Sequence, residues 1–397
     1  MEIGIVGKPN VGKSTFFAAA TLANAQIASY PFTTIEPNMG VAYVRTKCPH
    51  VELNVQCNPR NSLCMDGIRL VPVKMIDVAG LVPDAHKGRG LGNKFLDDLR
   101  QADCLIHIVD ASGSTTAEGN LCNPGEHDPL EDVAFLEREI HYWLAGILMK
   151  DWERRARGIE ISGGKLEDML AEKLAGLGMT HKHILAALHA APVDPSKPSK
   201  WKEEEFLAFS KILIKISKPV IIAANKADIA PEENLKKLLS LKDYIVVPTM
   251  ADYELALRRA AKSGIIRYTP GDTDFEIQKP ESLNEAQKKG LEKIREGLKK
   301  FGGTGVQKCI ETAVFKLLER IVVYPVEDEN HFRDKEGRVL PDAFLLPKES
   351  TARDLAYKVH TDLGKNFIRA INARTKMVLG ADYQLRDGDI IKIVAKG

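Results

Sequence analysis

The sequence predicts an α/β fold in which helices cover both faces of a mostly parallel sheet, followed by a smaller α+β module. Three observations support this prediction. Short apolar runs alternate with helical patterns over much of the chain, helical patterns alone fill residues 118–217, and strand patterns surround a single helix after residue 321. A chain of 397 residues is also longer than a single hydrophobic core usually supports, so we expect more than one domain.

The composition is that of an ordinary globular protein, since 44% of the residues are apolar and 28% are charged. It excludes a largely disordered, collagen-like or coiled-coil chain. The 56 basic and 54 acidic residues nearly cancel, so the net charge gives no argument for nucleic-acid binding. The sequence has no apolar run long enough to span a bilayer and no signal-peptide pattern, and we expect a cytoplasmic protein without a membrane partner. Six cysteines in a chain of this length do not predict a disulfide scaffold.

The first element is a predicted strand at Met1–Val6, a short apolar run that ends at a glycine and is expected to be buried on both faces. A helix at Lys13–Ala23 follows it. Further strands are predicted at Leu70–Ile76, Cys104–Val109, Val220–Ala224 and Tyr244–Val247. Polar residues follow most of these strands, and ligands of open α/β sheets bind beyond the carboxyl ends of the strands. That edge of the sheet is therefore the expected site.

The middle of the chain is predicted to be helical. Helices are expected at Pro129–Arg157, Lys165–Leu177, Thr180–Ala190 and Trp201–Ile216. The first helix carries apolar residues at i, i+3 and i+4 spacing between Val133 and Ile147, which predicts one buried face. A projecting helical arm and a bundle that covers the domain are both compatible with this pattern.

The last part of the chain is predicted to contain two helices and then the α+β module. The helices are expected at Ser282–Gly302 and Thr304–Arg320, and the elements of the module at Ile321–Val326, Ala343–Leu346, Thr351–Leu363 (a helix with Ser350 or Thr351 as its N-cap) and Ile390–Val394. The predicted domains are residues 1–117 with 218–265, a helical insertion at 118–217, a helical connector at 266–320, and the α+β module at 321–397.

A glycine-rich loop between the first strand and the first helix carries the clearest chemical signal. Residues 7–14 fit the pattern G-x-x-x-x-G-K-[ST] at each fixed position. The glycines let backbone N–H groups surround phosphate oxygens, and the following helix presents its positive end to the same charge. We expect Lys13 to stabilise charge on the transferring phosphoryl group and Ser14 to bind Mg²⁺. The predicted nucleotide-binding residues of this loop are Gly7, Lys8, Pro9, Asn10, Val11, Gly12, Lys13, Ser14 and Thr15.

Two further segments predict contacts with Mg²⁺ and the γ-phosphate. Asp77 ends an apolar strand, where its carboxylate can hold Mg²⁺ directly or through water. Gly80 lets the chain approach the γ-phosphate with its own N–H group. Thr34, in the loop Tyr30–Thr34, can add its hydroxyl to Mg²⁺ when a γ-phosphate is present, which would order that loop in one nucleotide state. The predicted magnesium ligands are therefore Ser14, Thr34 and Asp77.

The segment Asn225-Lys226-Ala227-Asp228 predicts recognition of the base. Its last carboxylate can accept hydrogen bonds from the N1–H and the exocyclic amine of guanine, whereas adenine has no such pair of donors at that edge. A helix N-cap would explain Asp228 equally well in isolation. The order of the segments along the chain favours a guanine site.

Together these segments resemble the motifs of translation-factor-type GTPases, and their details resemble the Obg family. PNVGKST, YPFTT and DVAGL carry this resemblance, and residues 84–93 and the helical insertion are similar to the YchF type, the Obg-like ATPase branch. The C-terminal stretches LPKESTARDLAYKVHTDLGKNF and LRDGDIIKI are similar to a TGS domain, a ubiquitin-like β-grasp module. The resemblance covers most of the chain and implies a P-loop NTPase fold.

The resemblance also implies roles for single residues. Thr34 matches the magnesium-sensing switch threonine, and Asn10 matches an asparagine that helps to hold K⁺ against the phosphates. Leu81 stands where many GTPases carry a water-orienting glutamine, so hydrolysis is expected to be slow or to use another group. The resemblance implies His86 as that group, since a neutral imidazole can position water, although an exposed loop histidine fits the sequence nearly as well.

Base specificity departs from the pattern of this branch. Many YchF-type proteins lack the NKxD pattern and accept ATP, whereas this chain retains it, which predicts a guanine preference. The base-binding loop that usually contains Ser-Ala is Met250-Ala251 here. Ala251 can offer a backbone N–H to the base, but Met250 lacks the hydroxyl that would stiffen the turn.

Two weaker patterns leave alternatives open. Cys48, His50, Cys57 and Cys64 cluster in the sequence without the Cys-x2-Cys spacing of a zinc ribbon, so a metal site, reduced thiols and a redox-sensitive bridge all fit. Basic residues on the TGS-like helix, among them Arg353 and Lys365, would suit RNA phosphates or a solvated face.

The sequence therefore predicts a Mg²⁺-dependent GTPase of slow turnover that acts as a nucleotide-controlled switch. The expected partners are GTP and GDP, with ribosome or RNA contact through the TGS-like domain and the helical insertion. An ATPase of the same fold with a stress-related role and a non-hydrolysing nucleotide-binding module remain the alternatives.

Overall fold

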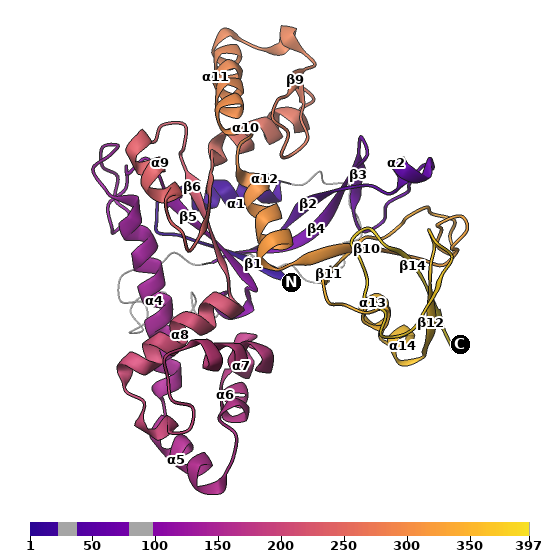
Figure 1. Ribbon diagram of the computed structural model, residues 1–397. Coiled ribbons are helices and arrows are strands. Elements are labelled where there is room, and N and C mark those ends of the chain that lie inside the picture. Colours follow the sequence, from indigo (N-terminus) through magenta and orange to yellow (C-terminus); the bar gives the residue numbers. More distant parts are fainter. Residues whose placement is uncertain (23–37, 79–97, 397) are drawn as a thin grey trace. The chain divides into compact units, whose positions relative to one another are not determined.

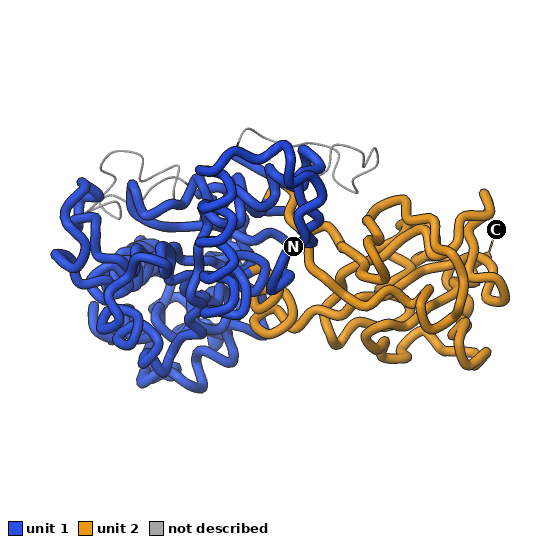
Figure 2. The backbone as a smooth tube through the Cα atoms, turned by 90° about the horizontal axis from the view of Figure 1, so that it is seen from above, with its two compact units in different colours: residues 1–20, 38–40, 74–309 blue, residues 21–37, 41–73, 310–397 orange. Residues whose placement is uncertain are grey.

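The structure is a computed structural model that describes residues 1–22, 38–78 and 98–396. The chain divides into two compact units (Figure 2). Unit 1 contains residues 1–20, 38–40 and most of 74–309, and unit 2 is formed mainly by residues 41–73 and 310–396.

The described residues form a seven-stranded sheet in the order β2-β4-β1-β5-β6-β7, with β3 paired to β4. Its strands are β1 (Glu2–Val6), β2 (Met39–Lys47), β3 (Leu63–Met65), β4 (Ile68–Asp77), β5 (Cys104–Asp110), β6 (Val220–Asn225) and β7 (Ile245–Pro248). β1 is parallel to β4 and β5, and the parallel pairing continues through β6 to β7. β3 and β4 form an antiparallel hairpin. The predicted mostly parallel sheet is confirmed, and β2 and β3 are additions that the sequence patterns did not predict.

Helices cover both faces of this sheet. Successive residues of a strand point to opposite faces, and the neighbours Leu105 and Ile106 of β5 are both 0% exposed. The register places Ile5 beside Asp77 and Asp110 beside Asn225, so the carboxyl ends of β1, β4, β5 and β6 meet at one edge. The first helix, α1 (Lys13–Thr21), begins at this edge.

The helical insertion contains α4 (Pro129–Met149), α5 (Trp152–Ser162), α6 (Leu166–Leu174), α7 (His181–Ala190) and α8 (Glu203–Ser217). The prediction of one helix over Pro129–Arg157 was wrong, because Asp151 adopts a left-handed φ of 57° and separates α4 from α5. A continuous apolar core joins Leu105 of the sheet to Leu144 and Trp152 of the insertion. One end of the bundle thus packs on the sheet, while α5 and α6 extend away from the strands (Figure 1).

The remaining elements of unit 1 follow β6. They are α9 (Glu232–Leu239), α10 (Ala251–Lys262), the short strands β8 (Ile266–Arg267) and β9 (Glu276–Ile277), α11 (Glu285–Phe301) and the start of α12 (Val306–Glu311). The single helix predicted over Thr304–Arg320 is α12 continued by a π-helical turn at Thr312–Leu317.

Unit 2 contains a five-stranded sheet in the order β11-β10-β14-β12-β13. Its elements are β10 (Arg320–Val326), β11 (Phe344–Pro347), α13 (Ala352–Val359), α14 (Thr361–Lys365), β12 (Phe367–Asn372), β13 (Val378–Leu379) and β14 (Ile390–Ala395). The predicted helix Thr351–Leu363 is interrupted at His360, whose backbone is extended. Thr351 is the N-cap, since its side chain accepts a hydrogen bond from Asp354 N. This arrangement confirms the predicted β-grasp module.

Candidate nucleotide-binding site

The phosphate loop connects the buried end of β1 to the first turn of α1. Two of its glycines are required by their surroundings. A Cβ on Gly7 would lie 2.8 Å from the carbonyl oxygen of Ile108, and a Cβ on Gly12 would lie 2.3 Å from Asn225 Nδ2. Gly12 also has a φ of +93°, which side chains rarely tolerate. The loop conformation is therefore fixed by close packing as well as by its sequence.

Lys13, predicted to contact the phosphates, and Asp77, predicted to hold Mg²⁺, lie together at the edge of the sheet. Lys13 Nζ forms an ion pair with the Asp77 carboxylate and donates to the carbonyl oxygen of Val78 at 2.8 Å. Ser14 follows Lys13 in the first turn of α1 and is exposed. A carboxylate and a hydroxyl are hard oxygen donors, and this donor set fits Mg²⁺. The other predicted phosphate and magnesium contacts, Thr34 and Gly80, lie outside the described residues, and so does His86.

Lys8 and Asn10 direct their side chains to neighbouring loops. Lys8 Nζ is 2.7 Å from Asp132 Oδ1 and 3.0 Å from the carbonyl oxygen of Thr115, and the side chain is almost fully buried. Only the backbone of Lys8 thus remains for a phosphate. Asn10 Nδ2 donates to the carbonyl oxygen of Gly119 at 2.9 Å, which fixes the orientation of the Asn10 amide.

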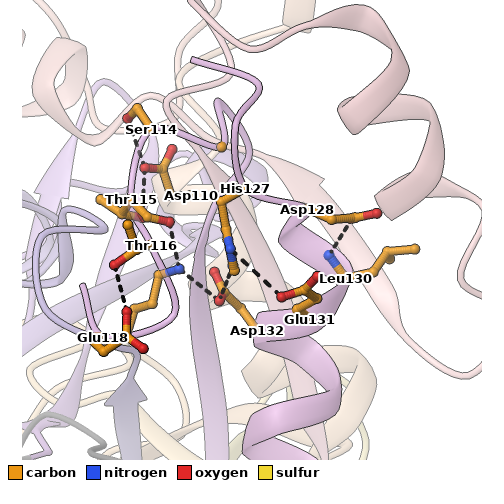
Figure 3. Close-up of polar contacts among 12 residues, drawn as sticks. Asp110, Ser114, Thr115, Thr116, Glu118, His127, Asp128, Leu130, Glu131 and Asp132 are labelled. Atoms are coloured by element: carbon orange, nitrogen blue, oxygen red, sulfur yellow. Dashed lines mark hydrogen bonds and ion pairs between the residues drawn. The ribbon is translucent and has the colours of Figure 1, made fainter. Parts of the chain in front are cut away.

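Asp132 stands at the centre of the buried network that Lys8 joins (Figure 3). Its Oδ1 lies 2.8 Å from His127 Nε2 as well as near Lys8. Burial nevertheless raises the pKa of Asp132, although the contacts with Lys8 and His127 oppose this effect. The network holds the start of α4 against the phosphate loop.

Asn225 joins the phosphate loop to the base-binding loop. Its Nδ2 donates to the carbonyl oxygen of Val11 at 2.9 Å, and its Oδ1 accepts the N–H of Ala251 at 3.0 Å. The N–H group of Ala251, which the sequence predicts to be available to the base, is thus hydrogen-bonded to Asn225. Met250 is 1% exposed and packs in the core beside α11.

Lys226 and Asp228 follow Asn225, the last residue of β6. Lys226 has a left-handed φ of 58°, and its Nζ lies 2.8 Å from Asp110 Oδ2. Asp228 is half-buried and close to Tyr253. Burial, reinforced by the charge of Asp228, raises the pKa of Tyr253 to about 12. The structure thus gathers the phosphate loop, Asp77 and the residues of the NKxD segment at one edge of the sheet.

Sequence reasoning missed the role of Asp110. This fully buried carboxylate accepts hydrogen bonds from Ser114 and Thr115 (Figure 3). It also accepts hydrogen bonds from Ser112 and Lys226. Burial alone would raise its pKa, but Lys226 and the serines outweigh that effect and lower it. The signal was visible as an aspartate at the end of an apolar strand, but no motif assigned it a partner.

Among the described residues, no helix is both long and apolar enough to span a membrane.

Comparison with protein families matches three parts of the chain. Residues 2–136 match a model described as a 50S ribosome-binding GTPase, residues 223–328 match the G4 motif-containing domain of YGR210-like Obg-like GTPases, and residues 335–395 match the TGS domain.

Individual proteins match over nearly the whole chain. The uncharacterized GTP-binding protein MJ1332 of Methanocaldococcus jannaschii is 57% identical over 99% of this chain and 98% of its own length. The ribosome-binding ATPase YchF of Bacillus subtilis is 27% identical over 98% of both chains. The crystal structure of a GTP-binding protein from Pyrococcus horikoshii OT3 covers 100% of both chains with 46% identity and a TM-score of 0.79.

Proposed function

Because this chain belongs to the Obg family of P-loop GTPases, in the YchF-type branch with a C-terminal TGS domain, we propose that it is a Mg²⁺-dependent GTPase of slow turnover that works as a nucleotide-controlled switch. Binding of a nucleotide follows from the family itself. The preference for GTP, the slow hydrolysis and the partner are the parts that need experimental tests.

The geometry of the NKxD segment is the observation that carries the GTP preference. Asn225 ties this segment to the phosphate loop at one end and to the loop of Ala251 at the other. Asp228 follows three residues later with a partly exposed carboxylate. A carboxylate at this position gains two hydrogen bonds from guanine and is left unpaired beside adenine, which costs affinity.

The residues at the phosphate end support slow hydrolysis. Lys13 would exchange its ion pair with Asp77 for the phosphate oxygens and stabilise the charge that develops on them. Asp77 and Ser14, with Thr34 from the first switch segment, would hold Mg²⁺, which neutralises phosphate charge when bound. Leu81 supplies no group to orient water, so turnover depends on His86 or on a residue from a partner.

The ribosome or its RNA is the proposed partner. The YchF relative is named a ribosome-binding ATPase, and the first family model is described as a 50S ribosome-binding GTPase. Arg353, Lys358, Lys365 and Arg369 are all exposed on the TGS domain, and the exposed ring of Tyr357 lies among them in sequence. Basic side chains with an aromatic neighbour suit RNA phosphates and bases. Such a partner would place the protein in the cytoplasm.

Nucleotide competition tests the base preference. GTP, GDP and ATP would each be titrated against a fluorescent GDP analogue bound to the full chain, and we expect GTP and GDP to displace it at least tenfold more effectively than ATP. Asp228→Asn should reduce GTP affinity and raise affinity for xanthosine triphosphate, whose ring carries a carbonyl in place of the amine. Asp243→Asn, a matched change at an exposed site that precedes β7, should leave both affinities unchanged.

ATP is the second candidate nucleotide, because Met250 replaces the usual serine and relatives in this branch are named ATPases. Equal displacement by ATP and GTP would favour that alternative. Single-turnover hydrolysis with and without ribosomes separates a hydrolysing switch from a binding module. Replacing KCl by NaCl in the same assay tests the proposed K⁺ site of Asn10, and identical rates would contradict it.

A further inference from the structure

Three cysteines and a histidine of unit 2 converge on one point. Cys48 follows β2, His50 begins α2 (His50–Leu53), Cys57 lies in the following loop, and Cys64 lies on β3. One ligand atom from each of these residues falls within 4.8 Å of all the others. The three cysteines are free thiols. The donors come from separate local structures, and unit 2 folds so that they face a common centre.

Three of the separations between these donors match those of a tetrahedral metal site. Cys48 Sγ lies 3.9 Å from Cys57 Sγ, and His50 Nδ1 lies 3.3 Å from Cys57 Sγ and 3.5 Å from Cys64 Sγ. Tetrahedral zinc with Zn–S bonds of about 2.3 Å and a Zn–N bond of about 2.0 Å requires S···S separations of about 3.8 Å and S···N separations of about 3.5 Å. The observed separations agree with these values to within a few tenths of an ångström. They are much longer than a disulfide bond of about 2.0 Å.

The backbone around the cluster is held independently of any metal. Asp66 and Gly67 have positive φ angles of 46° and 84°, as a tight hairpin turn between β3 and β4 requires. The N–H of Cys48 donates to the carbonyl oxygen of Gly67 at 2.8 Å, which fixes the end of β2 against this turn. The ligand positions are therefore preorganised.

A buried positive charge beside the cluster calls for a negative partner. Arg69 is 0% exposed and pairs with Cys64 across the β3–β4 hairpin. Its guanidinium group donates hydrogen bonds to the uncharged Ser62 hydroxyl and to the carbonyl oxygen of Leu340, and its Nε has no hydrogen-bond partner among the described residues. An uncompensated buried cation is costly. Three thiolates, one neutral imidazole and a divalent zinc ion sum to a net charge of −1, which would balance Arg69.

We propose that Cys48, His50, Cys57 and Cys64 form a structural zinc site. Zinc is favoured over magnesium or calcium because thiolate and imidazole are soft ligands and the four donors close a tetrahedron without an open position. All four proposed ligands belong to unit 2.

The loop that contains Cys57 also shows what the zinc would stabilise. Asn58 N donates to the carbonyl oxygen of Val339, Arg60 N donates to that of Pro341, and the Asn61 side chain exchanges two hydrogen bonds with the backbone of Ala343. The site would clamp both ends of this loop, at Cys57 and Cys64, and keep it paired with residues 339–343 of the same unit.

Metal analysis of the full chain tests this proposal. Protein produced with zinc in the medium and dialysed against a weak chelator should contain about one zinc ion per chain by mass spectrometry of the metal. Cys57→Ser and Cys64→Ser should each lower the zinc content severalfold. Cys122→Ser, which changes a half-buried cysteine of unit 1, is the matched control and should retain all the zinc.

A second measurement on the wild-type chain covers the case in which the variants do not fold. Zinc should protect Cys48, Cys57 and Cys64 from alkylation at least about tenfold compared with chelator-treated protein, and Co²⁺ added to the metal-free chain should give the visible absorption of a tetrahedral thiolate site. Zinc content below about a tenth of an ion per chain, together with unchanged alkylation rates, would overturn the proposal. A chain mass two hydrogens lower, with a Cys48–Cys57 bridge found by peptide mapping, would overturn it in favour of a redox-sensitive disulfide.

Discussion

Replacing Asn225 by alanine should destabilise unit 1 even without nucleotide. The change removes two hydrogen bonds of 2.9 and 3.0 Å. It also leaves the carbonyl oxygen of Val11 and the N–H of Ala251 without partners in residues that are 0% and 1% exposed. Each buried unpaired backbone group costs about 1–3 kcal/mol, so we expect a loss of about 3 kcal/mol. At about 2–4 °C per kcal/mol for a unit of this size, the melting temperature should fall by roughly 6–12 °C.

Tryptophan fluorescence measures this loss selectively. The chain has three tryptophans, Trp143, Trp152 and Trp201, and all are buried in unit 1, so their emission follows the unfolding of that unit. Asn234→Ala is the matched control, because the Asn234 side chain is also buried and donates a single, longer hydrogen bond, at 3.2 Å, to the carbonyl oxygen of Ala111 within the described residues. We expect it to cost about 1 kcal/mol. If Asn225→Ala lowers the melting temperature no more than Asn234→Ala does, Asn225 does not hold the two loops together.

Three further predictions concern two buried groups of unit 1 and the proposed role of His86. Burial, aided by the positive charge of Lys8, lowers the pKa of His107 to about 3. Between pH 6.5 and 3 the unfolded chain therefore binds a proton that the folded chain does not, and the free energy of unfolding decreases as the pH decreases through this window. His107→Leu should remove about 2 kcal/mol of the stability difference between pH 7.5 and pH 5 in urea unfolding, and an unchanged slope would contradict this account. Asp132→Leu should lower the free energy of unfolding by about 3–5 kcal/mol, because it leaves Lys8 buried without its carboxylate partner. The double variant with Lys8→Met should recover most of that loss. A double variant as unstable as Asp132→Leu alone would refute the ion-pair argument. His86→Ala should slow single-turnover hydrolysis more than it weakens nucleotide binding, and an unchanged rate would remove His86 from the mechanism.

The parts of the fold that were predicted correctly depend on local patterns. β1, β4, β5 and β6 are apolar runs that end in a glycine or a polar residue, and their chemistry lies at those ends. Helix breaks were missed where a single residue departs from helical geometry. Asp151 with its positive φ and His360 with its extended backbone interrupt patterns that remain amphipathic on both sides.

The parts of the site that were missed depend on contacts between distant residues. Lys226 and Asp110 are 116 positions apart, and no spacing rule joins them. The sequence singles out Cys48, His50, Cys57 and Cys64 and leaves a metal site as one alternative, but it could not predict their geometry, because a hairpin turn at Asp66 and Gly67, rather than a short knuckle, brings Cys64 to the other three residues. Contacts of this kind can be identified only once the register of neighbouring strands, such as β5 and β6, is known.

The close approach of Gly12 to Asn225 gives a second reason why this position of the phosphate loop is a glycine. Glycine at this point is commonly attributed to the demands of the ligand, yet here the amide of Asn225 already fills the space that a methyl group would occupy. The phosphate loop and the NKxD segment thus constrain each other through their own packing. An attempt to engineer a wider cradle, for a bulkier triphosphate analogue, would have to redesign residues 12 and 225 as a pair.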